Sequence, residues 1–131
     1  MAGKYLIAID DDEDSAQLIA RVATRCGYAT HVMTDSRALE TVLTERAPDV
    51  VSLDLSMPEV DGLQVLDVLR RAEFAGHVII VSGHPTCMRR HVSGVAKGQG
   101  LNVAGHFYKP INTADLARLL KNVETGRLEA N

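Results

Sequence analysis

Short apolar runs alternate along this chain with longer segments whose apolar residues recur every three or four positions. The short runs predict strands, and three of them are almost entirely apolar, as expected of strands buried on both faces. We expect five strands, at residues 4–9, 28–34, 49–55, 77–83 and 103–108. Strands separated by helices indicate βαβ units, and therefore an α/β fold: a doubly wound parallel sheet with helices on both faces.

The helical segments are expected to start at polar capping residues and to end at glycine or before proline. The first ends at Gly27 and the second before Pro48, while a third runs to about Ala72. The candidate caps are Asp14 or Ser15 for the first helix and Asp35 or Ser36 for the second. A blurred period predicts a helix over residues 85–97, and a closing helix covers residues 113–124. The expected core face of that last helix consists of Leu116, Leu119, Leu120 and Val123.

Composition limits the classes of protein that fit this pattern. The chain has 131 residues, of which 46% are hydrophobic, so one domain with a sizeable core is expected. A net charge of -3 gives no general attraction to nucleic acid or to a membrane surface. The apolar runs are too short to span a bilayer, and no signal peptide is evident. Cys26 and Cys87 are expected to be reduced thiols. Together these features favour a cytoplasmic location.

Polar residues that can carry chemistry stand where the predicted strands end. Asp10 and Asp11 follow the first strand, Asp54 lies at the end of the third, Ser82 of the fourth and Lys109 of the fifth. Ligands bind at the carboxyl ends of strands in sheets of this kind. Three carboxylates there require a cation, and Mg²⁺ fits an oxygen-ligand set. A carboxylate can also accept a phosphoryl group, with Mg²⁺ and an ammonium stabilising its oxygens.

Each of these residues also has a simpler interpretation. Asp54 alone could be a turn residue, Ser82 could bond its own backbone, and Lys109 could be a solvated surface lysine. For the acidic residues 12–14, capping and complementarity with the helix dipole are the favoured interpretation. The coincidence of the other residues at matching strand ends favours a site.

Four motifs in this order resemble the receiver domain of two-component response regulators. They are the acidic pair after the first strand, "LDLSMPEVDGL" around Asp54, "VIIVSG" with Ser82, and "FYKP" with Lys109. The resemblance runs from Tyr5 to about Glu124 and implies a flavodoxin-like fold with strand order 2-1-3-4-5. We therefore expect a receiver domain over residues 1–125 and a tail or the start of a linker over residues 126–131.

The resemblance implies a phosphorylation site that uses Mg²⁺ as its cofactor. Asp54 would accept a phosphoryl group from a phosphohistidine on a sensor histidine kinase or a phosphotransfer protein. Asp11, Asp54 and the backbone carbonyl of Ser56 would bind Mg²⁺ directly, and Asp10 chiefly through a water. Such a domain is a signalling phosphoacceptor that promotes its own phosphorylation and dephosphorylation, not an ordinary enzyme.

The same resemblance implies how phosphorylation is transmitted. Lys109 would pair with the phosphoryl oxygens, and Ser82 would move toward them as the switch hydroxyl. The peptide bond between Lys109 and Pro110 would be cis. His106 stands where the family usually has an aromatic switch residue. Pro58 and Gly62 would shape the loop after the acceptor. The last two helices and the strand between them would form the interface for a homodimer or an effector domain.

Several alternatives remain at the level of sequence. The stretch "KGQGLNVAGHFYKP" resembles receivers attached to EAL-type cyclic-di-GMP phosphodiesterases, and the end at "GRLEAN" fits either a single-domain regulator or an excised domain. A phosphorylation-independent pseudo-receiver, acting as a binding or dimerisation module, is the second hypothesis. An aspartyl-phosphate phosphatase is disfavoured because Ser56 stands where its second aspartate is usual. The spacing of His84, His91 and His106 matches no common zinc motif.

Overall fold

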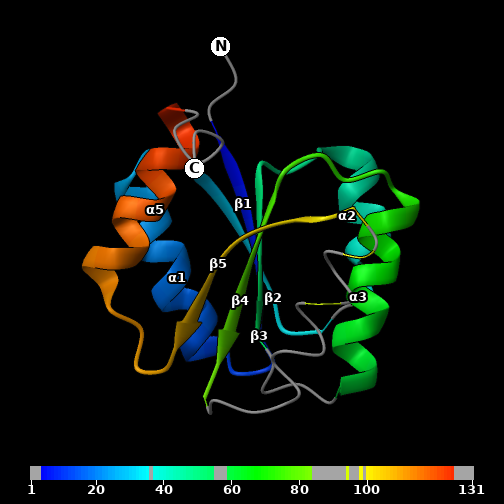
Figure 1. Ribbon diagram of the computed structural model, residues 1–131, viewed down its shortest axis with the longest axis horizontal. Coiled ribbons are helices and arrows are strands. Elements are labelled where there is room, and N and C mark those ends of the chain that lie inside the picture. Colours follow the sequence, from blue (N-terminus) through cyan, green and yellow to red (C-terminus); the bar gives the residue numbers. More distant parts are fainter. Residues whose placement is uncertain are drawn as a thin grey trace.

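The computed structural model describes residues 4–35, 37–54, 59–83, 94, 98 and 100–125, with the backbone alone at 59–62 and 124–125 (Figure 1). Five parallel strands form one sheet in the order β2-β1-β3-β4-β5, which confirms the predicted fold. The strands are β1 (Tyr5–Ile9), β2 (Ala29–Met33), β3 (Val50–Asp54), β4 (His77–Ser82) and β5 (Asn102–Tyr108).

Two helical layers cover the sheet. Helices α1 (Glu13–Arg25) and α5 (Thr113–Thr125) lie on one face, and α2 (Leu39–Glu45) and α3 (Glu59–Arg71) lie on the other (Figure 1). The helix predicted over residues 85–97 falls outside the described residues except at position 94. Within the part of the chain that the structure describes, no helix is long and apolar enough to cross a bilayer.

The core is divided by the sheet into two clusters, because successive strand residues point to opposite faces. Ile7 and Leu53 belong to the cluster beneath α3, whereas Leu6 and Val50 belong to the cluster shared with α1 and α5. The predicted core face of the last helix is confirmed. Its fully or nearly buried members are Leu116, Leu120 and Val123, and Leu119 packs against them partly buried.

The predicted caps of the first two helices are wrong. Asp12, not Asp14 or Ser15, caps α1, and the Ser15 hydroxyl donates to the Asp12 carboxylate at 3.1 Å. The helix starts earlier because two further acidic residues fit the positive end of the helix dipole in its first turn. Ahead of α2, Asp35 accepts from the backbone N–H of Arg37 in a turn of its own, so that helix begins later and without a side-chain cap. Ser36 lies outside the described residues.

Two helices end in the same hydrogen-bonded motif with different residues at its left-handed position. After α1, the predicted stop at Gly27 is confirmed, with a φ of 91° there. After α3, Glu73 has a φ of 56°, while the N–H groups of Glu73 and Phe74 donate to the carbonyls of Arg70 and Leu69, each at 3.0 Å. Glycine adopts this conformation without the steric cost that a Cβ brings, so Glu73 is a strained substitute.

Candidate functional site

Three charged side chains converge at the carboxyl edge of the sheet. Asp10 directly follows β1, Asp54 is the last residue of β3, and Lys109 directly follows β5. The ammonium of Lys109 forms an ion pair with Oδ2 of Asp54 and lies 3.5 Å from Oδ2 of Asp10. Both carboxylates are fully buried, whereas Lys109 retains 23% of its side-chain exposure. Two buried carboxylates thus share one partly exposed ammonium as their cationic partner.

Backbone hydrogen bonds fix where these side chains start. The N–H of Asp10 donates to the carbonyl of Met33 in β2 at 3.0 Å, which extends the sheet by one residue. The N–H of Lys109 donates to the carbonyl of Ser82 at 2.8 Å and ties the ends of β4 and β5 together. The peptide bond between Lys109 and Pro110 is cis, which confirms the prediction from the resemblance.

The proximity of the two carboxylates changes how they bind protons. Burial, and next the neighbouring Asp54 carboxyl, raise the pKa of Asp10 from 3.8 to about 7, although the hydrogen bond from the Asp12 N–H and the charge of Lys109 lower it. Burial alone would lower the pKa of Lys109, but its interactions with Asp54 and then Asp10 outweigh burial and raise it. The cluster therefore has too little positive charge, because the one ammonium does not compensate for two buried carboxylates.

The remaining candidate residues lie at the same edge or outside the described residues. Asp11 follows Asp10 and is exposed. Ser82 is the last residue of β4 and is 5% exposed. His106 lies in β5, paired with Ile80 of β4, and is exposed. The predicted carbonyl ligand at Ser56 lies outside the described residues, as do Pro58 and the zinc candidates His84 and His91.

The described part of the cluster fits a magnesium ion. Oδ2 of Asp10 is buried and, within the residues that the structure describes, accepts no hydrogen bond, so it has capacity for a further cation. No three His, Cys, Asp or Glu side chains among the described residues form a complete cage for a metal. Mg²⁺ does not need one, because it usually keeps several waters and takes only one or two carboxylates.

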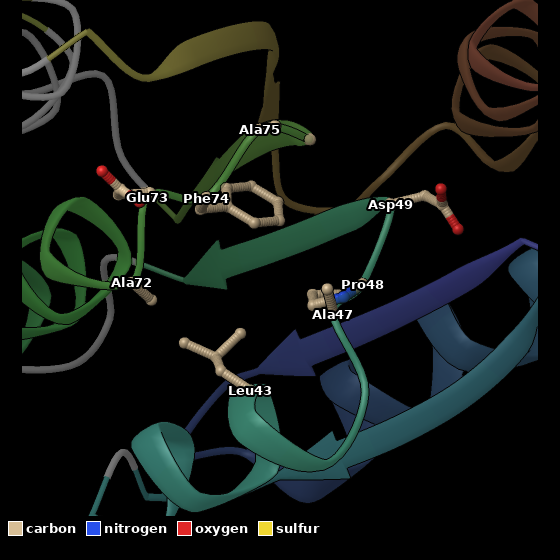
Figure 2. A pocket seen from close by; sticks show the side chains of 9 residues that line it. Leu43, Ala47, Pro48, Asp49, Ala72, Glu73, Phe74 and Ala75 are labelled. Atoms are coloured by element: carbon tan, nitrogen blue, oxygen red, sulfur yellow. The ribbon is translucent and has the colours of Figure 1, made fainter.

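A partly open hollow of about 330 Å³ lies at the opposite edge of the sheet, beside the amino ends of β3 and β4. Figure 2 shows Leu43, Pro48 and Phe74 around it, while the carboxylates of Asp49 and Glu73 point away from it. Its lining is mostly apolar and holds none of the charged residues of the cluster. The hollow is therefore separate from the candidate site.

Comparison with known proteins decides the family. Residues 6–121 match the response regulator receiver domain family, which is most of the chain. The chain belongs to this family. Receiver domains are signalling phosphoacceptors that generally bind Mg²⁺ at an acidic pocket, and a phosphoacceptor function follows for this receiver domain.

Individual relatives agree with the assignment. An NtrX-like response regulator of Rickettsia bellii is 30% identical over 88% of this chain and 24% of its own length. The phosphate regulon regulatory protein PhoB of Pseudomonas aeruginosa is 26% identical over 94% of this chain and 52% of its own. A response regulator structure from Colwellia psychrerythraea superposes with a TM-score of 0.81, at 28% identity, over 94% of this chain and 98% of that one. The receiver domain thus spans between a quarter and about half of these two curated relatives.

Sequence reasoning missed one residue at this edge. The interpretation of residues 12–14 as capping and dipole-complementing residues is confirmed, with Asp12 as the N-cap of α1, but it did not include the bond from the Asp12 N–H to Oδ1 of Asp10 at 2.8 Å. The signal for this bond was the position of Asp12 two residues after Asp10, because an aspartate side chain commonly accepts the backbone N–H two residues on.

Proposed function

We propose that Asp54 is the phosphoacceptor of this receiver domain and that Asp10 and Lys109 complete its reaction site. The observation that carries the proposal is the ion pair of Lys109 with a fully buried Asp54, beside a second buried carboxylate. An aspartate oxygen at this position has a cation within reach of any group attached to it. Electrostatic stabilisation of the transferring group is the main contribution that a protein makes to phosphoryl transfer.

In the proposed reaction, a carboxylate oxygen of Asp54 attacks the phosphorus of a phosphohistidine. A P–O bond forms as the P–N bond breaks, and the electron pair stays with the imidazole nitrogen, which takes up a proton. The product is an acyl phosphate on Asp54 and a free histidine on the donor. Lys109 pairs with the phosphoryl oxygens, since its ammonium already contacts the acceptor carboxylate.

The metal ligands in this proposal are the Asp54 and Asp11 carboxylates and the Ser56 backbone carbonyl, with Asp10 acting chiefly through a water. Mg²⁺ held by these residues would neutralise charge on the phosphoryl oxygens. The buried Oδ2 of Asp10 and its raised pKa support a cation at this edge, because both reflect insufficient positive charge in the cluster.

We further propose that phosphorylation changes partner binding through Ser82 and His106. The Ser82 carbonyl already accepts the N–H of Lys109, so the switch hydroxyl and the phosphate-binding lysine belong to adjacent strand ends. New contacts to a phosphoryl group would shift the population between two arrangements of this edge. Hydrolysis of the acyl phosphate by the same site would end the signal.

The proposed partners are a sensor histidine kinase or phosphotransfer protein in the cytoplasm and, on the output side, an effector domain or a second copy. The proposed output surface is the last two helices and the strand between them. The resemblance of residues 97–110 to receivers of EAL-type phosphodiesterases suggests that class of effector. The proposed extent of the domain is residues 1–125, with residues 126–131 as a tail or the start of a linker.

Phosphorylation by acetyl phosphate, followed by intact-mass spectrometry, tests the assignment. Wild-type protein should gain one phosphoryl group in Mg²⁺ and none in EDTA, and Asp54→Asn should gain none. Asp67→Asn is the matched control, because Asp67 is an exposed carboxylate on α3, paired with Arg70 and Arg71. Undiminished labelling of Asp54→Asn would refute the assignment. A wild-type protein that neither binds Mg²⁺ nor accepts the group would instead be a pseudo-receiver.

A further inference from the structure

We propose that Asp12 is a positioning residue for the magnesium site. Its backbone N–H holds the side chain of Asp10 in place, and its own carboxylate holds that N–H at the start of α1. The inference rests on the proposed function, because it concerns the same site. It gives Asp12 a role that capping of α1 alone does not include.

The first step is the division of the Asp10 carboxylate between two tasks. Oδ1 accepts the Asp12 N–H at 2.8 Å, whereas Oδ2 lies 3.5 Å from the Lys109 ammonium. Asp10 is fully buried, and its backbone is fixed by the bond to Met33 of β2. The bond to Asp12 therefore determines the remaining freedom, which is the rotation of the carboxylate that turns Oδ2 toward the site.

The second step is that Asp12 is itself held at both of its oxygens. Oδ1 accepts the N–H of Asp14 and Oδ2 accepts the hydroxyl of Ser15, both at 3.1 Å. The carbonyl of Asp12 accepts the N–H of Ala16, the first backbone bond of the helix. With φ of -97° and ψ of 107°, Asp12 has the extended backbone of an N-cap residue.

The third step is what this cap leaves available. In a capping box, the third helical residue turns back to accept the N–H of the cap residue. Here the third helical residue is Ser15, whose hydroxyl donates to the Asp12 carboxylate instead. The N–H of Asp12 is consequently used by Asp10, and the start of the helix is coupled to the orientation of the carboxylate that would hold the metal chiefly through a water.

Loss of the Asp12 side chain would free its backbone to rotate, and the N–H would lose its alignment with Asp10. Residues that hold metal ligands by hydrogen bonds typically change metal affinity by about 10- to 100-fold when mutated. The donor here is a backbone group that is loosened and not deleted, so we expect the lower end, about 10-fold.

The test is a Mg²⁺ titration of the full chain, followed through backbone amide shifts by NMR. Asp12→Gly should weaken Mg²⁺ binding about 10-fold with little change in thermal midpoint, because glycine is a good N-cap for stability. Asp12→Asn should bind within about 2-fold of wild type, because asparagine caps equally well. Asp14→Asn is the control that removes the same charge from the same turn while its N–H stays. Ser15→Ala, which releases one Asp12 oxygen, should fall between, at about 3-fold.

Wild-type affinity in both Asp12→Gly and Ser15→Ala would overturn the inference and leave the proposed function intact. Equal losses in Asp12→Asn and Asp12→Gly would also overturn it, because the charge of Asp12 and not its geometry would then be responsible. Absence of Mg²⁺ binding by the wild-type protein would overturn the inference and the proposed metal site together.

Discussion

Neutralising Asp10 should stabilise the receiver domain when Mg²⁺ is absent. Asp10 is fully buried next to Asp54, and its pKa rises from 3.8 in the unfolded chain to about 7 in the folded protein. Folding therefore favours the protonated form. The contribution of Asp10 to stability is fully present below about pH 4 and is lost progressively as the pH rises toward 7. The substitution Asp10→Asn removes this loss, and its amide oxygen can still accept the N–H of Asp12.

The magnitude follows from the two pKa values. At 1.36 kcal/mol per pH unit, the difference between 3.8 and about 7 corresponds to about 4 kcal/mol at pH 8. Rearrangement of Lys109 and entry of water reduce the penalty of a buried charge, so we expect a gain of about 1–3 kcal/mol for Asp10→Asn. At about 3–5 °C per kcal/mol for a domain of this size, the midpoint of thermal unfolding should rise clearly.

The assay is urea unfolding in EDTA at pH 5, 6, 7 and 8, for wild type and Asp10→Asn. The gain should be small at pH 5 and largest at pH 8. Asp14→Asn is the control, since Asp14 is exposed in the first turn of α1 and loss of its charge should give no gain in stability. A gain that does not grow with pH, or an equal gain in the control, would refute the reasoning. Mg²⁺ at ten times its Kd should stabilise wild type by about 1.4 kcal/mol and Asp10→Asn by less.

Four further substitutions test local features of the fold, each by urea unfolding. Glu73→Gly should stabilise by about 0.5–1 kcal/mol because it relieves a left-handed φ, and Gly27→Ala, at the equivalent position after α1, should destabilise similarly. Ser52→Ala should be neutral or stabilise by about 1 kcal/mol, because the Ser52 hydroxyl is buried and lacks a hydrogen bond among the described residues. Gly76→Ala should destabilise by about 1–3 kcal/mol, because its Cβ would collide with the backbone carbonyl of Asp49. A change of the opposite sign in any of them contradicts the contact that it tests.

The strands and their order were predictable because burial on both faces leaves a strong mark on sequence. Segments such as "YLIAI" of β1 and "HVIIVS" of β4 are almost wholly apolar. The edge strand β2, "ATHVM", carries alternating exposure and was predictable mainly from its position between two helices. The convergence of Asp10, Asp54 and Lys109 also follows from topology, since parallel strands present their carboxyl ends at one edge.

The details of side-chain bonding were not predictable in the same way. Asp12, Asp14 and Ser15 are all good caps, and propensity alone does not choose among them. The choice of Asp12 depends on Asp10, which lies outside the helix and takes the N–H of the cap residue. The left-handed Glu73 left no signal either, because the usual marker of a helix end there is glycine. These features depend on partners that no local pattern encodes.

The charges of the site explain why a metal-dependent switch fits this fold. Without a metal, two buried carboxylates share the ammonium of Lys109, and burial, together with the neighbouring Asp54, raises the pKa of Asp10 despite that ammonium. A phosphoryl group on Asp54 would replace the single negative charge of the carboxylate with nearly two. Lys109 would then bind the stronger anion, and Asp10 would need the metal as its partner. Because the N–H of Lys109 donates to the carbonyl of Ser82, any shift of the Lys109 backbone would displace the ends of both β4 and β5. In the proposed function, the charge added at Asp54 would in this way change the edge of the sheet to which partners bind.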